Sequence, residues 1–206
     1  LPADWSMSAW NPGGTATVSG GVLSVDGAKA GTIASYPAGR SLEFVATFSG
    51  APFQHIGFGD TFDAAPFAMF STVAGGGLFA RTESTSAGPS TPLSSSLLGS
   101  PHRFRIDWTP VEATYSIDGA IVATHAIAIN APLRPLVSDF ETGTGAVTVD
   151  WMRIGPYSAG GTFLSRVFDA GTAANWGTLS WTAQVPPGSG ASFFARHGDT
   201  PAPDAT

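Results

Sequence analysis

Short runs in which apolar and polar residues alternate recur along this sequence, and glycine, proline or serine interrupts them. In Ser41–Phe48 every second residue from Leu42 onward is apolar, and the same alternation returns over His102–Trp108. A period of two places such residues on one face of a β-strand, whereas a helix needs a period of 3.6. With 26 Gly and 16 Pro in 206 residues, long helices are disfavoured. The pattern predicts an all-β sandwich of antiparallel strands.

Turn residues predict how these strands connect. Asp118 and Gly119 separate two alternating runs, Ala113–Ile117 and Ala120–Thr124. This dipeptide suits the positive φ angles of a two-residue type I′ turn, so a β-hairpin is expected there. The stretch Ser84–Ser100 is rich in Ser, Pro and Gly and has no periodicity, which predicts a long surface loop.

A linker-like run, Gly155–Gly161, interrupts the strand pattern and predicts a domain boundary. Residues 1–157 are expected to form the first domain. Residues 158–206 are expected to hold a linker and an incomplete second β-sandwich domain, with about three strands near 165–171, 179–183 and 192–196.

The charge balance excludes several classes of partner. The chain has 15 acidic and 9 basic residues, a formal net charge of −6, so it lacks the basic surface that nucleic acids or anionic lipids require. No segment has the roughly 18 consecutive apolar residues of a membrane span, so no membrane insertion is expected. The start at Leu1 without a leader, together with scarce lysine, favours a secreted or cell-surface bacterial protein.

Cofactor chemistry is also disfavoured. The sequence has no cysteine, which rules out disulfides, thiolate nucleophiles and cysteine-ligated metals. The four histidines are far apart, and Asp60 and Asp63 lack the rest of any calcium-binding pattern. We therefore expect no metal and no cofactor.

Several segments, taken in order, resemble the concanavalin A-like superfamily, which includes lectins and laminarinase-like glucanases. The matching segments are Gly20–Val25, Leu42–Phe44, Phe53–Gly59, His102–Pro110, Tyr115–Gly119 and Val149–Ile154. The resemblance covers residues 1–157 and is most specific from His102 to Gly119. It implies a jelly roll of two curved antiparallel sheets whose concave face holds a carbohydrate.

The C-terminal piece is similar to the opening strands of a β-sandwich repeat of large bacterial surface proteins. Its matching segments are Phe168–Gly171, Leu179–Trp181 and Arg196–Pro201. This resemblance implies that the chain is part of a longer modular polypeptide.

The acidic catalytic motif of the resembled hydrolases is missing. Laminarinase-like enzymes carry Glu-x-Asp-x-Glu or Glu-x-Asp-x-x-Glu on one strand, and the only acidic pair at spacing two here is Asp139 and Glu141. Glycoside hydrolysis needs two carboxyl groups about 5–10 Å apart. The sequence therefore speaks against that enzyme family, but not against every hydrolase.

Strand alternation nevertheless predicts a polar and aromatic surface. It turns Phe79, Arg81 and Glu83 outward from one strand and His55 from another. If Leu136 and Phe140 face the core, Asp139 and Glu141 also turn outward. The predicted ligand-binding residues are His55, Phe79, Arg81, Glu83, Asp139 and Glu141. The alternative is an exposed Arg81–Glu83 ion pair of little consequence beside two solvated acids.

Three functions remain open. The first is a non-catalytic, lectin-like carbohydrate-binding module with its site on the concave sheet, away from the face of Arg103, Arg105 and Asp107. The second is a polysaccharide hydrolase or lyase that uses groups of that same surface. The third is a structural spacer or adhesion domain without a small ligand. Fold alone does not choose among them.

Overall fold

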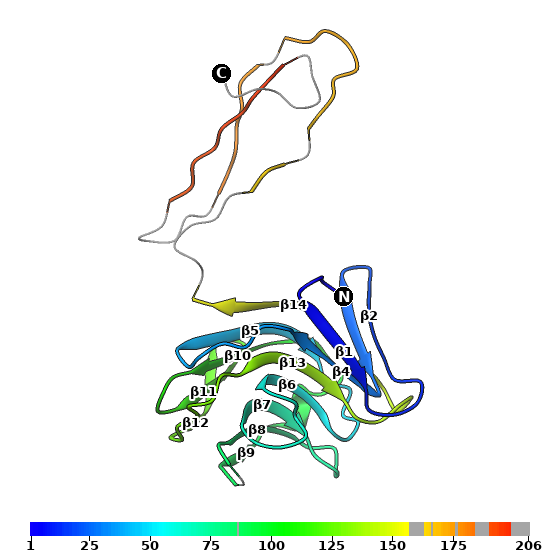
Figure 1. Cartoon of the computed structure of the whole chain (residues 1–206), viewed down its shortest axis with the longest axis vertical. Helices are drawn as coiled ribbons and strands as arrows, with labels where there is room; N and C mark the ends of the chain where they lie inside the picture. The colour runs from blue at the N-terminus through cyan, green and yellow to red at the C-terminus, as the bar shows by residue number, and fades with distance from the viewer. Residues whose placement is uncertain (86, 157–162, 166, 176, 184–189, 199–206) are drawn as a thin grey trace. The chain divides into compact units, whose positions relative to one another are not determined.

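The computed structural model describes residues 1–85, 87–156, 163–165, 167–175, 177–183 and 190–198. Its strands form two seven-stranded sheets, and every strand pairing in them is antiparallel (Figure 1). The first sheet has the order β1 (Trp5–Ala9), β4 (Ala28–Thr32), β13 (Arg134–Asp139), β6 (Gln54–Gly59), β7 (Phe67–Thr72), β8 (Leu78–Glu83) and β9 (Ser90–Pro92). The second sheet has the order β12 (Ala120–His125), β11 (Ala113–Ile117), β10 (His102–Trp108), β5 (Arg40–Thr47), β14 (Val147–Gly155), β3 (Val22–Asp26) and β2 (Thr15–Ser19).

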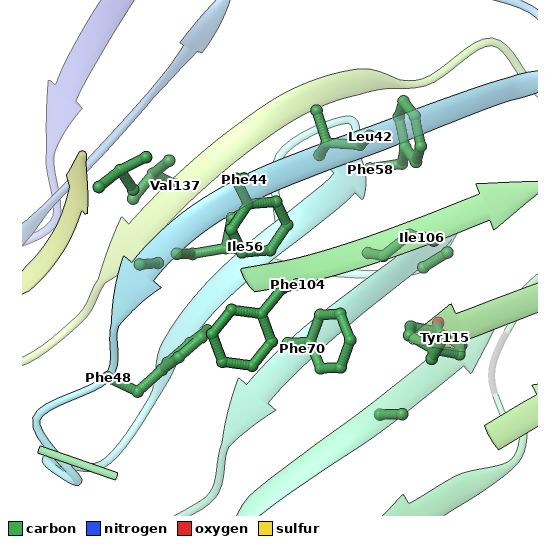
Figure 2. Close-up of a cluster of buried hydrophobic side chains, with 14 of the residues drawn as sticks. Leu42, Phe44, Phe48, Ile56, Phe58, Phe70, Phe104, Ile106, Tyr115 and Val137 are labelled. Atoms are coloured by element: carbon green, nitrogen blue, oxygen red, sulfur yellow. The ribbon is translucent and has the colours of Figure 1, made fainter. Parts of the chain in front are cut away.

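Alternating apolar side chains from both sheets fill the space between them, and Figure 2 shows these side chains meeting. The ring of Phe104 lies at its centre, 4.8 Å from Phe70 of the first sheet and 5.5 Å from Phe44 of the second. All three side chains are fully buried. Burying a side chain of this size stabilises a fold by about 1.5–3 kcal/mol, so this layer holds the sheets together.

The strongest sequence patterns predicted their strands correctly. The alternation over 41–48 became β5, and that over 102–108 became β10, with Leu42, Phe44, Phe104 and Ile106 in the core. The expected hairpin joins β11 to β12, and both of its turn residues have positive φ, 51° at Asp118 and 86° at Gly119. The all-β prediction is therefore confirmed.

The stretch predicted as one long loop, 84–100, contains two short elements. Strand β9 pairs with β8 at the edge of the first sheet, and a 3₁₀ turn covers Ser95–Leu97. A strand of three residues is too short to show an alternation, and Pro92 suits an edge position because it cannot donate to a further strand. This is why the sequence pattern missed β9.

By backbone contacts the chain divides into two units, Leu1–Tyr157 and Ser158–Thr206. In the described residues of the second unit no strand is assigned, so the three strands expected there remain a prediction; parts of them lie outside the described residues. Within this unit the rings of Trp181 and Phe193 stack with centroids 4.1 Å apart. No helix among the described residues is long and apolar enough to cross a membrane.

Candidate functional site

The outer face of the first sheet, the face that points away from the core, carries most of the predicted site residues. His55 lies opposite Ser138 of β13 on one side and Ser71 of β7 on the other, and Ser71 lies opposite Phe79. Directly paired residues share a face, so these four side chains form one row across β13, β6, β7 and β8. Arg81 and Glu83 follow on the same face of β8.

Apolar side chains cover the neighbouring part of this face. Phe62, Phe67, Met69 and Leu136 form a second buried cluster, separate from the core between the sheets. Phe62 comes from the loop after β6, and a Cβ on Gly59 would lie only 2.4 Å from its ring. The glycine therefore lets the ring lie directly on the sheet, and the row through His55 is left beside an apolar wall.

Arg81 and Glu83 are paired with each other. Arg81 Nη2 lies 2.8 Å from Glu83 Oε1, and the guanidinium carbon lies 5.2 Å from the centre of the Phe67 ring. Both side chains are partly exposed, so the pair itself contributes little to stability. With 27% and 21% of their side chains exposed, Arg81 and Glu83 remain accessible to a polar ligand on this face.

Asp139 corrects the sequence-based prediction, because it points into the protein. Asp139 pairs with Gln54, is fully buried, and accepts a hydrogen bond of 2.9 Å from Gln54 Nε2. The prediction took Leu136 for the core face; Val137 occupies that face instead, and Leu136 joins the outer apolar cluster. Apolar residues on both faces of β13 made the alternation ambiguous.

A buried polar network explains why Asp139 and Gln54 face inward. The side-chain amide of Gln54 also donates to Ser49 Oγ and to the carbonyl of Gly145, while its oxygen accepts from the Ser49 amide. Burial raises the pKa of Asp139 to about 6, although the hydrogen bond from Gln54 opposes this shift. The Gln54 amide thus ties two loops to β6, and the Asp139 carboxyl, fully buried on the core side, does not reach a ligand on the outer face.

Glu141 lies beyond the end of β13 and is partly exposed. Its carbonyl accepts a hydrogen bond from the Gly27 amide at 3.1 Å, which fixes the backbone but leaves the side chain outside the sheet. Of the six predicted residues, the structure therefore places His55, Phe79, Arg81 and Glu83 on one face. It places Glu141 past the strand end and Asp139 on the opposite face.

His55 is neutral in the folded protein at physiological pH. Burial, reinforced by the charge of Arg81, lowers the pKa of His55 to about 4. Its ring makes an edge contact with Phe62, with centroids 5.9 Å apart, and its buried Nδ1 has no hydrogen-bond partner among the described residues. A buried polar nitrogen without a partner is costly to the stability of the fold.

An aromatic cluster that the sequence analysis missed lies where β13 and β6 meet their loops. The Phe140 ring lies 5.8 Å from the Trp10 ring and 6.0 Å from the Phe53 ring. Phe140 and Phe53 are 42% and 37% exposed, which is unusual for rings that pack together. We call Trp10, Phe53 and Phe140 the aromatic cluster.

Polar contacts attach the aromatic cluster to the His55 row. Trp10 Nε1 donates to Ser138 Oγ at 2.9 Å, and Ser138 lies opposite His55. Lys29 Nζ lies 4.0 Å from the centre of the Trp10 ring. Trp10 and Phe140 lie outside the strands, and Phe53 has a φ of 60°, so no alternation could have brought these rings together. Their only signal in the sequence was their residue type.

Exposed rings beside a neutral imidazole suit a sugar better than a metal or a charged reactant. An aromatic face covers the apolar face of a pyranose, while a few fixed polar groups bond its hydroxyls. Among the described residues, no group of three or more His, Asp or Glu could hold a metal ion. On the strands of this face the only carboxylate in the described residues is that of Glu83, which already pairs with Arg81.

No protein-family model matches the sequence, and no curated protein matches it significantly. Solved structures do match. A prokaryotic β-1,3-1,4-glucanase (lichenase) from a mouse hindgut metagenome aligns with a TM-score of 0.53 at 14% identity, over 76% of this chain and 95% of its own. A Bacillus licheniformis β-glucanase aligns with a TM-score of 0.52 at 14% identity, over 74% and 92%.

A sialidase aligns with a TM-score of 0.54 at 13% identity over 74% of this chain, but the chain spans only 17% of its length. At such low identity these neighbours show the fold alone, and they agree with the two antiparallel sheets described above. Residues 1–157 of this chain have the concanavalin A-like jelly-roll fold.

Proposed function

We propose that residues 1–157 form a non-catalytic carbohydrate-binding module of a secreted or cell-surface bacterial protein. The observation that carries this proposal is the aromatic cluster, whose rings are in contact with one another yet partly exposed beside the row of Ser138, His55 and Ser71. A glycan chain lying across β13, β6, β7 and β8 would stack on the cluster and reach Phe79 and the Arg81–Glu83 pair. The neutral imidazole of His55 favours a neutral glycan over a charged one.

A polysaccharide hydrolase is the second candidate. It is favoured by solved neighbours that are glycan-cleaving enzymes, such as a lichenase and a β-agarase. Against it stands the absence of a facing pair of carboxyl groups on the strands of the outer face, as far as the described residues go. A hydrolase reaction at this face would have to use the carboxylates of Glu83 and of the partly exposed Glu141 beyond β13.

The test is a glycan array followed by titration of each hit, with a reducing-end assay run on the same polysaccharides. Phe140→Ala removes the ring that touches both other rings, and we expect about tenfold weaker binding, equivalent to about 1.4 kcal/mol. Ile121→Ala is the matched control, since Ile121 is 70% exposed on β12 of the second sheet. We expect the control to bind like the wild type.

Glu83→Gln and Glu141→Gln separate binding from catalysis, because the amide keeps the shape but loses the carboxylate. In a binding module neither change creates or removes turnover. Loss of turnover with retained binding in either variant would establish a hydrolase. A wild-type protein that neither binds nor cleaves any glycan of a broad panel would leave a spacer or adhesion domain as the function.

A further inference from the structure

Arginine side chains gather on the outer face of the second sheet around one buried carboxylate. Glu43 on β5 lies opposite Arg105 of β10 on one side and Arg153 of β14 on the other. Its side chain is only 4% exposed. Arg103 Nε donates to Glu43 Oε1 at 2.5 Å, and Arg153 Nε donates to Oε2 at 2.7 Å. The carboxylate is thus fully used in holding these guanidinium groups in place.

A second carboxylate orients Arg105. Its Nε and Nη2 donate to the two oxygens of Asp107 at 2.7 and 2.5 Å. The side chains of these three arginines remain 40–54% exposed. The carboxylates therefore hold them in fixed orientations while part of each side chain still contacts solvent, which is a preorganised arrangement.

A depression of about 450 Å³ lies beside this cluster, and Arg40, Arg105 and Arg153 line it together with Ser41 and the two paired carboxylates, Glu43 and Asp107. Arg40 forms no ion pair with any described residue, and its guanidinium carbon lies 5.5 Å from the centre of the Tyr36 ring. The volume falls within the range of about 300–1,000 Å³ that is usual for small-molecule sites.

The charge of this surface is opposite to that of the whole chain. Arg103, Arg105 and Arg153 surround two carboxylates and Arg40 lines the same depression, so this surface has an excess of positive charge, whereas the protein carries a formal net charge of −6. A local excess of guanidinium groups raises the local concentration of anions. The fork of N–H donors on Arg40, which has no ion pair with a described carboxylate, matches the paired oxygens of a carboxylate or of a sulfate.

We propose that this depression is an oxyanion-binding site that takes the carboxylate or sulfate group of an acidic saccharide. The oxyanion lies against Arg40, and the hydroxyl of Ser41 is within the same depression for a sugar hydroxyl. The choice of a saccharide rests on the proposed function, whereas the oxyanion site itself does not. The site departs from the sequence-based expectation that ligands avoid the face of Arg103, Arg105 and Asp107.

The experiment titrates the full chain with trigalacturonate and with its methyl ester, which has the same sugar skeleton without the charges. A sulfated galactan tetrasaccharide and its unsulfated counterpart form the second pair. We expect each acidic member that binds to bind at least tenfold more tightly than its neutral partner. Arg40→Gln should weaken that binding about tenfold, the effect of losing one charge-assisted contact, without changing the melting temperature.

Arg134→Gln is the matched control, because it removes the same charge from the other sheet, where Arg134 bonds the carbonyls of Asp60 and Thr32. This variant should bind trigalacturonate like the wild type. Tighter binding of the acidic member in one probe pair or in both supports the site. The pair that shows it identifies carboxylate, sulfate or both as the ligand group. Equal binding of acidic and neutral members, or equal losses in Arg40→Gln and Arg134→Gln, would overturn it.

The two proposals fail separately. Phe140→Ala should weaken neutral glycans and leave trigalacturonate unaffected, since the aromatic cluster and Arg40 lie on different sheets. Loss of neutral-glycan binding in the panel would remove the proposed function and leave the oxyanion site standing. No binding of either acidic probe would remove the oxyanion site alone.

Discussion

His55 illustrates how a single titratable residue links the outer face of the first sheet to stability. Its imidazole is neutral in the fold because burial and the charge of Arg81 lower its pKa to about 4, against an ordinary value of 6.5. The unfolded chain therefore binds a proton on His55 at a higher pH than the folded chain does. It follows that the contribution of this group to stability is full above pH 6.5 and is lost as the pH falls toward 4.

A comparison of the wild type with His55→Asn tests this. Two other groups also change the pH dependence of stability. The pKa of Asp139 is raised to about 6, and burial lowers the pKa of His125. Both residues are present in both proteins, so their effects cancel in the difference. Between pH 7 and pH 4.5 we expect the wild type to lose on the order of 2 kcal/mol more unfolding free energy than the variant. Parallel pH profiles in urea unfolding would contradict the assignment.

At the scale of the strand, glycine decides how closely β6 and β7 approach. An added Cβ at Gly57 would lie 2.3 Å from the carbonyl oxygen of Ala68 and 2.5 Å from Cα of Met69. Both are backbone atoms of β7, so no side-chain rotation relieves the contact. The outer apolar cluster and the His55 row depend on this close pairing.

We therefore expect Gly57→Ala to lower the unfolding free energy by about 3 kcal/mol, at the upper end for overpacking. Gly75→Ala is the control, because a Cβ there meets nothing within 4 Å, and it should stay within about 0.5 kcal/mol of the wild type. Urea unfolding followed by circular dichroism measures both. Equal stabilities for the two variants would show that β6 and β7 can separate without cost.

Strands with one apolar face could be predicted from the sequence, and strands with two could not. Along β5 and β10 the apolar residues alternate and lie on the core face. The alternation therefore predicted both the strands and which of their residues point inward. In β6 the alternation that turned His55 outward also placed its neighbour Gln54 inward. This is correct, and hydrogen bonds to Ser49, Asp139 and Gly145 satisfy the buried polar side chain of Gln54. In β13 both faces are buried, and the choice between Leu136 and Val137 depended on packing that the sequence does not display.

The candidate site was predictable only where it lies on strands. His55, Phe79, Arg81 and Glu83 share a face because their strands pair in register. The aromatic cluster combines three loop or strand-end residues, and the two nearest in sequence are more than 40 positions apart. Phe53 also has a positive φ, so the backbone leading into β6 is not extended at this residue. Such contacts follow from the tertiary fold, so the spacing of these residues in the sequence does not predict them.

For the whole molecule, the decisive feature is that the core of the sandwich draws its buried residues from one unit. Every described member of the main core cluster lies between Leu23 and Val149. In the second unit, apolar side chains such as Phe163, Leu164 and Phe194 are at least 90% exposed. The first unit thus has its own core, while the described part of the second unit leaves apolar surface uncovered.

A chain that ends at Tyr157 should therefore fold on its own. We expect it to be soluble, to unfold cooperatively in urea, and to melt within a few degrees of the full chain, because no described core residue is removed. Circular dichroism at a strand wavelength follows both transitions, and the glycan titration repeated on the shortened chain checks that the aromatic cluster is intact. Aggregation, or melting without a transition, would mean that strands after Ser158 complete the first core and that the domain boundary lies elsewhere.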